Sequence, residues 1–114
     1  MNLFTRLIAT AIVTSSIFGA TVANADIYHA GEFTITLGED ADNGRTYRGC
    51  DSQGNCINLT NGTAWRDDGY RGITWDNGEY SYSISWREGG SEPIYLNIYK
   101  NNTRILRRQL VPIQ

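Results

Sequence analysis

Residues 72–86 place the strongest constraint on what this chain can fold into. At their centre stands Asn77-Gly78, the dipeptide that most readily adopts the positive φ angles of a type I′ turn. Runs rich in β-branched and aromatic residues flank it on both sides. The sequence therefore predicts a β-hairpin with Asn77-Gly78 as its two-residue loop, in which Trp75 pairs with Tyr80.

Strand side chains alternate between two faces, so this hairpin sorts its residues by chemistry. One face is apolar and aromatic, with Ile73, Trp75, Tyr80, Tyr82, Ile84 and Trp86. The other is small and polar, with Gly72, Thr74, Ser81, Ser83 and Ser85. A slip of one residue would turn the apolar set toward water, so the pattern specifies the faces. The tryptophans Trp65, Trp75 and Trp86 are assigned to the core.

The first 25 residues have the features of a cleavable export signal. Arg6 supplies a basic start, residues 7–18 an apolar stretch, and Ala23-Asn24-Ala25 a small-x-small cleavage site. Hydroxyl residues interrupt the apolar stretch, whereas a membrane anchor needs about 20 apolar residues. We therefore expect a bacterial-type signal peptide over 1–25 and a single periplasmic or extracellular domain over 26–114, with no membrane association after cleavage.

Two cysteines in an exported chain predict one structural disulfide, Cys50–Cys56, closing a turn-rich loop. A redox pair more often has two intervening residues. A zinc site would need further ligands, and His29 is the one histidine of the sequence. We expect no metal and no cofactor.

Short strands separated by turn residues fill the rest of the domain, and residues 26–31 are expected to be a loosely held lead-in. Asn61-Gly62 is a second hairpin signal, leading into a strand over 63–66. The last hairpin keeps its apolar residues together with a three-residue loop, Asn101-Asn102-Thr103, which pairs Ile98 with Leu106.

No helical periodicity follows the leader, and about eight short strands occur at regular spacing. The fold class is therefore all-β. We expect a small antiparallel β-barrel, mostly a meander, because closure removes exposed strand edges. A two-sheet β-sandwich is the alternative.

The charge balance argues against nucleic-acid binding, which needs a basic surface. The chain has 10 Lys and Arg against 12 Asp and Glu, a net charge of −2. The charge is uneven: residues 26–79 have ten acids and four arginines, a net of −6, and residues 80–114 have five bases and two acids, a net of +3. Such a dipole suits an oriented partner or self-assembly.

Catalytic constellations are mostly missing from the sequence. One histidine makes a Ser-His-Asp triad hard to assemble. The carboxylate pairs, such as Asp67 with Asp68, lie in predicted turns, which rarely raise a carboxyl pKa as acid catalysis requires. A small hydrolase is therefore the last of three hypotheses, and we expect no enzymatic activity.

A binding surface is the leading hypothesis. The outer face of the last hairpin would expose Tyr95, Asn97, Tyr99, Ile105 and Arg107, residue types that are enriched at recognition sites. The sequence predicts an exported, non-enzymatic module, a monomer or weak homo-oligomer, that binds an envelope protein or a glycan through this face. In size and strand count it resembles periplasmic lysozyme inhibitors, a likeness that implies inhibition on grounds of fold alone. A structural or self-assembling envelope subunit is the alternative.

Overall fold

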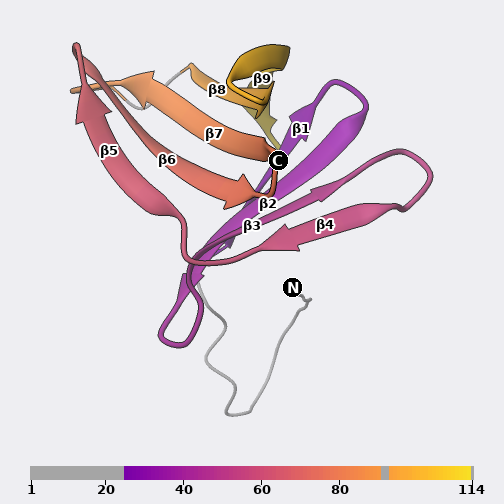
Figure 1. The fold of residues 1–114 in the computed structure, drawn as a ribbon. Coiled ribbons are helices and arrows are strands. Elements are labelled where there is room, and N and C mark those ends of the chain that lie inside the picture. Colours follow the sequence, from indigo (N-terminus) through magenta and orange to yellow (C-terminus); the bar gives the residue numbers. More distant parts are fainter. Residues whose placement is uncertain (1–24, 91–92, 114) are drawn as a thin grey trace.

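A computed structural model describes residues 25–90 and 93–113, and this part of the chain is all-β (Figure 1). The strands are β1 (Ala25–Ala30), β2 (Phe33–Asp40), β3 (Gly44–Cys50), β4 (Cys56–Leu59), β5 (Thr63–Asp67), β6 (Tyr70–Asn77), β7 (Tyr80–Arg87), β8 (Ile94–Lys100) and β9 (Thr103–Pro112). Within the described ranges there is no helix with the length and apolar character to cross a membrane. The predicted leader, except for Ala25, lies outside them.

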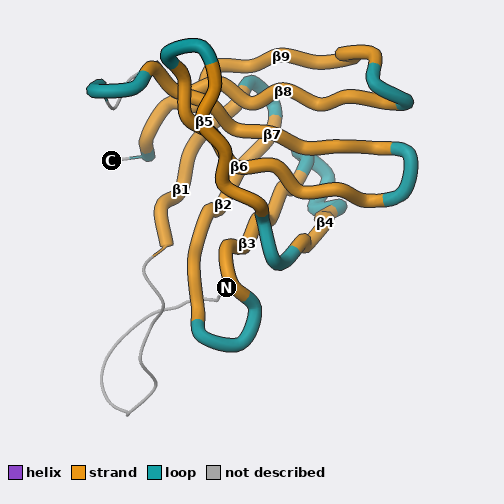
Figure 2. The backbone as a smooth tube through the Cα atoms, turned by 60° about the vertical axis from the view of Figure 1, so that its left-hand side comes forward, coloured by secondary structure: helices purple, strands orange, loops and turns teal. Residues whose placement is uncertain are grey.

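The strands form one antiparallel sheet in the order β4-β3-β2-β1-β9-β8-β7-β6-β5. It consists of two meanders, β1–β4 and β5–β9, which face each other in Figures 1 and 2. They join where β1 meets β9, through the pairs Tyr28↔Pro112 and His29↔Val111. The described sheet thus has nine strands where eight were expected, and it curls into half a barrel with β4 and β5 at its edges.

The chain between β4 and β5 explains why the barrel stays open. Asn61 was predicted to turn a hairpin, and it does adopt a positive φ of 59°. Its amide, however, donates to the carbonyl of Asn43, and the amide of Gly62 donates to the carbonyl of Arg45. The hairpin prediction for Asn61-Gly62 is wrong: β4 pairs with β3, β5 pairs with β6, and the linker crosses from one meander to the other.

The expectation of a loose lead-in is also wrong. Residues 25–30 form β1, which pairs with β2 along its whole length and with β9 at its end. Ala30 is completely buried and Tyr28 half-buried, so β1 contributes to the core. Its alternation is short, and the acidic and polar residues among its six hide the strand pattern.

The hairpin of β6 and β7 has the predicted faces, but its turn lies one residue further along the chain. Asn77 pairs with Tyr80, which leaves Gly78 and Glu79 as the loop, and Trp75 faces Tyr82. Gly78 has a φ of 65° and Glu79 is not among the positive-φ residues, the pattern of a type II′ turn. Each β6 residue therefore pairs with a β7 residue two positions beyond the predicted one, as Trp75 does with Tyr82 in place of Tyr80. A shift of two positions keeps every side chain on its predicted face.

The last hairpin pairs Ile98 with Leu106, as predicted, but with a different loop. Asn101 and Asn102 have φ angles of 50° and 69° and form a two-residue type I′ turn, so Thr103 already pairs with Lys100. Beyond the turn, Ile105 forms a β-bulge: it has no partner, because Tyr99 pairs with Arg104 and the next pair is Ile98↔Leu106. This extra residue in β9 compensates for the shorter loop and gives the predicted pairing of Ile98 with Leu106.

The core lies between the two meanders. Its buried residues are Ala30, Ile35, Tyr47, Trp75, Ile84, Leu96 and Leu110. The ring of Tyr47, from β3, lies 5.3 Å from that of Trp75 and 5.4 Å from that of Tyr82, so it fills the space between the halves. Burial raises the pKa of the Tyr47 hydroxyl well above its ordinary value, and the neighbouring Tyr82 adds to the shift.

The predicted disulfide is present. Cys50 and Cys56 are directly opposite each other at the ends of β3 and β4, and their sulfur atoms are bonded. Within the loop that they close, the Asp51 carboxylate accepts hydrogen bonds from the amides of Gln53 and Asn55. These bonds, with Asn55 the main cause, lower the Asp51 pKa.

Candidate ligand-binding groove

The face of β5–β9 turned away from the core carries a groove of about 610 Å³. Strand pairing aligns its residues in rows across the sheet. One row runs from Trp65 through Gly72 and Ser85 to Tyr95. The lining side chains are aromatic, cationic, acidic or small and polar, and comprise Trp65, Asp67, Asp68, Tyr70, Ser85, Arg87, Pro93, Tyr95, Asn97, Tyr99, Arg104 and Arg107.

Trp65 lies against this face because the residue opposite it is glycine. A Cβ atom built on Gly72 would come within 2.2 Å of the Trp65 ring, so any larger residue would displace the indole. The Trp65 Nε1 donates a 3.0 Å hydrogen bond to the Thr74 hydroxyl, and that hydroxyl donates a 3.0 Å bond to the Ser83 hydroxyl. These two hydrogen bonds hold the Trp65 ring, one wall of the groove, and end at the buried Ser83 hydroxyl.

Asn97 is the floor residue beside Ser83. It pairs with Ser83 on one side and with Arg107 on the other. The residue is only 8% exposed, and its Oδ1 is buried with no hydrogen-bond partner in the described part of the chain. Buried acceptors are nearly always satisfied, and an unpaired one costs free energy. Asn97 lines the groove, so its Oδ1 would accept from a ligand donor that displaced the groove side chains covering it.

Arginines supply the positive charge of the groove. The Arg107 guanidinium lies over the Tyr95 ring, 4.2 Å from its centroid. Arg87 lies 5.1 Å above the Tyr70 ring and donates a 3.2 Å hydrogen bond to the Tyr70 hydroxyl. Stacking on a ring uses the face of the guanidinium and leaves N–H groups in its plane for other acceptors.

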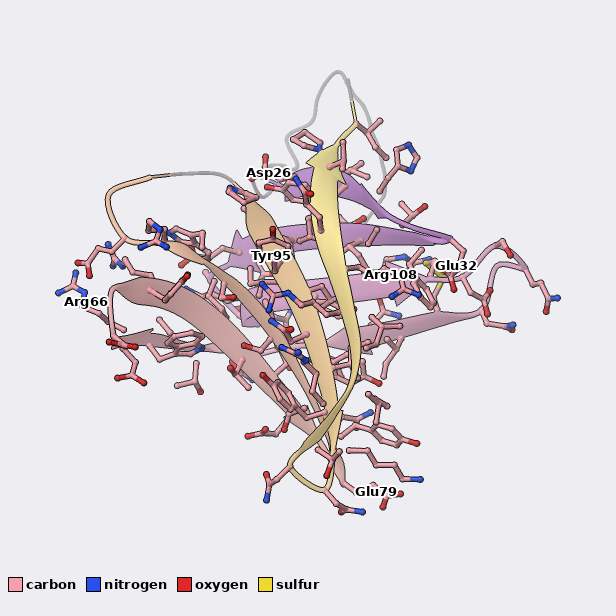
Figure 3. All side chains as sticks on the ribbon, turned by 90° about the horizontal axis from the view of Figure 1, so that it is seen from above. Asp26, Glu32, Arg66, Glu79, Tyr95 and Arg108 are labelled. Atoms are coloured by element: carbon pink, nitrogen blue, oxygen red, sulfur yellow. A yellow bond between two sulfur atoms is a disulfide. The ribbon has the colours of Figure 1, made fainter. Side chains whose placement is uncertain are left out.

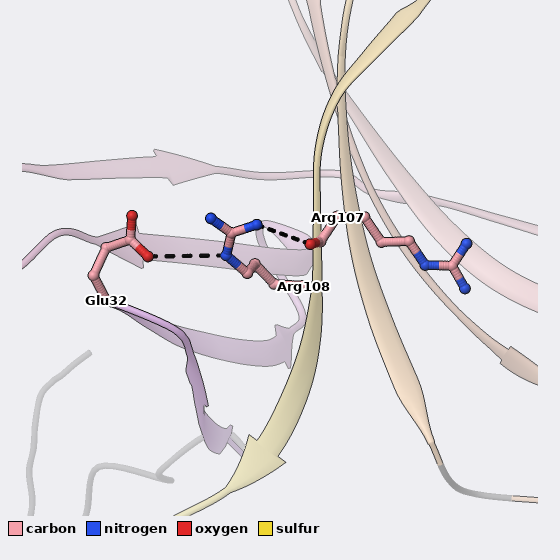
Figure 4. Close-up of polar contacts among 3 residues, drawn as sticks. All are labelled: Glu32, Arg107 and Arg108. Carbon is pink, nitrogen blue, oxygen red and sulfur yellow. Dashed lines mark hydrogen bonds and ion pairs between the residues drawn. The ribbon is translucent and has the colours of Figure 1, made fainter.

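The neighbouring residues Arg107 and Arg108 place their side chains on opposite faces of β9 (Figure 4). Arg107 lines the groove. Figure 4 shows Arg107 and Arg108 extending from opposite sides of β9, with Arg108 directed toward Glu32. The Arg108 Nε lies 3.9 Å from a Glu32 oxygen, and Nη1 donates a 3.0 Å bond to the Arg107 carbonyl. Figure 3 shows the same division, with Tyr95 and Arg108 on opposite sides of β9.

The structure brings four of the five sequence-predicted site residues together. Tyr95, Asn97, Tyr99 and Arg107 all line the groove. Ile105 does not line it: it is the bulged residue of β9 and is 54% exposed. The sequence pattern could not place it, because the bulge changes the alternation at that point.

Sequence reasoning missed the residues that β5 and the turns contribute. Trp65 was assigned to the core, but it pairs with Gly72 and so stands on the polar face. Arg87, Arg104, Asp67 at the end of β5 and Asp68 in the turn after it also line the groove. The run of small residues across β6 and β7 was the available signal, because such a run leaves room for a ring.

A second hollow of about 320 Å³ lies between the meanders, where the half-barrel is open. It is lined mainly by core side chains and by the disulfide loop, including Phe33, Ile35, Tyr47, Cys56, Ile57 and Tyr82. Within the described ranges, no side-chain nitrogen or oxygen that lines it is both buried and unpaired. We therefore interpret this hollow as the solvent-exposed edge of the hydrophobic core and not as a ligand site.

Among residues 25–90 and 93–113, no three His, Cys, Asp or Glu side chains lie close enough to hold a metal ion. Asp40 holds the β2–β3 turn by accepting the amides of Asp42 and Asn43, and the Asn43 bonds lower its pKa. A lowered carboxyl pKa suits a turn cap better than an acid catalyst.

Comparison with protein-family models, with curated proteins and with solved structures finds no match to this chain.

Proposed function

We propose that this protein is an exported, non-enzymatic binding module that takes a polar ligand, an envelope glycan or protein, into the groove of β5–β9. The observation that carries the proposal is Asn97 in the groove floor, with a buried and unpaired Oδ1. A protein gains nothing in stability from such an atom, whereas a binding site gains a directed acceptor.

The surrounding side chains support recognition over chemical conversion. Tyr95, Tyr99 and Trp65 provide ring surface with polar tips, which suits sugar rings and interface side chains alike. The Cys50–Cys56 disulfide supports export, because such bonds persist in oxidising compartments. The signal peptide over 1–25 belongs to the same proposal.

The test is a glycan and envelope-protein array probed with the purified protein. Tyr99→Ala/Arg107→Ala removes a ring and a charge from the groove, and we expect it to abolish capture of whichever ligand the parent retains. Ile105→Ala and Arg108→Ala, on β9 like Arg107 but outside the groove, are the controls and should retain capture. A ligand held equally by the parent and the double variant, or a parent that retains nothing, would overturn the proposal.

A further inference from the structure

The distribution of charge in the groove indicates what kind of ligand it takes. Three arginines and two aspartates line it, although the whole chain is acidic with a net charge of −2. Asp67 ends β5 and Asp68 follows it in the turn to β6, whereas Arg104 and Arg107 lie on β9, at the opposite end of the β5–β9 meander. The β9 side of the groove is therefore cationic.

The β9 arginines are available to an anion. The ion pairs found in the described residues, Arg66–Glu88 and Arg108–Glu32, involve neither Arg104 nor Arg107. Arg107 is instead held over the Tyr95 ring, which orders its guanidinium without neutralising it. A stacked arginine with free N–H groups is preorganised to bind a carboxylate with two parallel hydrogen bonds.

Arg107 is also the cross-strand partner of Asn97. The site thus sets a positive donor beside a buried neutral acceptor, on adjacent strands. A matching ligand needs a carboxylate next to a hydroxyl or N–H donor. Uronic acids and related acidic sugars have this arrangement within one ring, and their C–H faces can pack on tyrosine or tryptophan rings.

An extended peptide fits the groove less well. Its floor is β7 and β8, and both strands are paired on both sides, so their backbone groups are already used by the sheet. Peptides that bind sheets through main-chain hydrogen bonds need a free edge. A single-stranded nucleic acid is disfavoured because its continuous row of phosphates would pass the carboxylates of Asp67 and Asp68.

We propose that the ligand is an acidic oligosaccharide. Its carboxylate pairs with Arg107, its neighbouring hydroxyl donates to the Asn97 Oδ1, and its ring packs on the aromatic side chains. This inference rests on the proposed binding role of the groove, and it adds the chemical class of the ligand.

Isothermal titration with the purified protein tests it. The probes are oligogalacturonate, oligomannuronate and hyaluronate fragments, each beside its methyl ester, which keeps the rings and removes the charge. We expect at least one acid to bind about tenfold or more tightly than its ester, because charge-assisted bonds are about twice as strong as neutral ones. Arg107→Gln should bind acid and ester alike, and Arg108→Gln, its neighbour outside the groove, should keep the preference.

The alternative ligands are arms of the same experiment. Polyglutamate or oligothymidylate bound as tightly as the best acidic sugar would overturn the inference, and so would the absence of binding by all three acids. Equal binding of an acid and its ester, lost in Tyr99→Ala, would overturn the acidic class and leave the groove as a neutral-glycan site. Binding that persists unchanged in Tyr99→Ala and Arg107→Gln would overturn the site itself.

Discussion

The indole Nε1 of Trp75 donates a 2.9 Å hydrogen bond to the backbone carbonyl of Arg45, on the opposite meander. The same carbonyl accepts the amide of Gly62, so one oxygen joins β6, β3 and the linker between the halves. Trp75 is 2% exposed. A Cβ on Gly62 would come within 2.6 Å of the indole, so the linker requires glycine at this crossing.

We expect Trp75→Phe to destabilise the fold by roughly 2 kcal/mol or more, because it removes a buried hydrogen bond and part of a packed ring. Urea unfolding followed by far-ultraviolet circular dichroism measures the change. Trp65→Phe is the control, since it also removes an indole hydrogen bond, but from a half-buried ring on the groove face. A loss no greater than that of the control would contradict the role of Trp75 as the link between meanders.

Breaking the disulfide should cost less than removing the core tryptophan. The six-residue separation of Cys50 and Cys56 closes a short loop, and loop-closure entropy for such a length is about 2 kcal/mol. Cys50→Ser/Cys56→Ser should therefore lower the free energy of unfolding by about that amount and leave ligand capture intact, since the loop lies away from the groove. Loss of capture in a folded double variant would contradict this separation.

Asn97→Val should stabilise the protein and weaken its binding. The substitution removes a buried acceptor that lacks a partner, for a gain of about 1 kcal/mol in the free energy of unfolding. It also removes the acceptor offered to the ligand. Asn58→Val, on the exposed edge strand β4, is the control and should bring no such gain, because Asn58 Oδ1 already accepts from Arg48. A destabilised Asn97→Val would show that the amide serves the fold.

Alkaline pH should unfold the domain through Tyr47. Burial raises its pKa above the ordinary value of 10.0, so the unfolded chain releases this proton at lower pH than the folded one. The stabilisation is complete below pH 10 and declines above it, by up to about 1.4 kcal/mol per pH unit for one such group. Urea unfolding across this range should show the decline.

Tyr47→Phe should flatten that pH dependence, because it removes the buried hydroxyl. The Tyr82 pKa is also raised by burial, with Tyr80 nearby as a second cause. A residual slope in Tyr47→Phe would therefore be traced with Tyr82→Phe. An unchanged slope in the double variant would contradict the assignment.

The faces of the hairpin strands could be predicted from sequence, whereas the turns could not. Trp75 and Tyr82 share a face under either loop, because moving the turn by one residue preserves side-chain parity. Which two residues form the loop depends on the twist of the sheet and on the pairing with the next strand, and the residues of the hairpin alone do not determine either. The pair Ile98↔Leu106 was predicted correctly because the extra residue of the bulge, Ile105, offsets a loop one residue shorter than predicted; the bulge itself was not predicted.

Contacts between distant segments account for what the sequence could not show. Asn61 has the chemistry of a hairpin turn and the matching φ, yet its amide bonds to Asn43 on another strand. The groove likewise depends on Trp65 lying over Gly72, a pairing that the shortness of β5 concealed. Tyr95, Asn97 and Tyr99 line the groove together because they alternate within β8, and Arg107 joins them as the partner of Asn97, beyond the bulge of β9.

The seam between β1 and β9 has a kinetic consequence. Each meander is built from hairpins between neighbours in the chain, which close quickly, but the seam joins the first and last strands through two pairs of residues. We expect the hairpins to appear early and the union of the halves to be the slow, rate-setting event. For a chain threaded through a membrane from its amino end, that event would wait until the final strand had emerged.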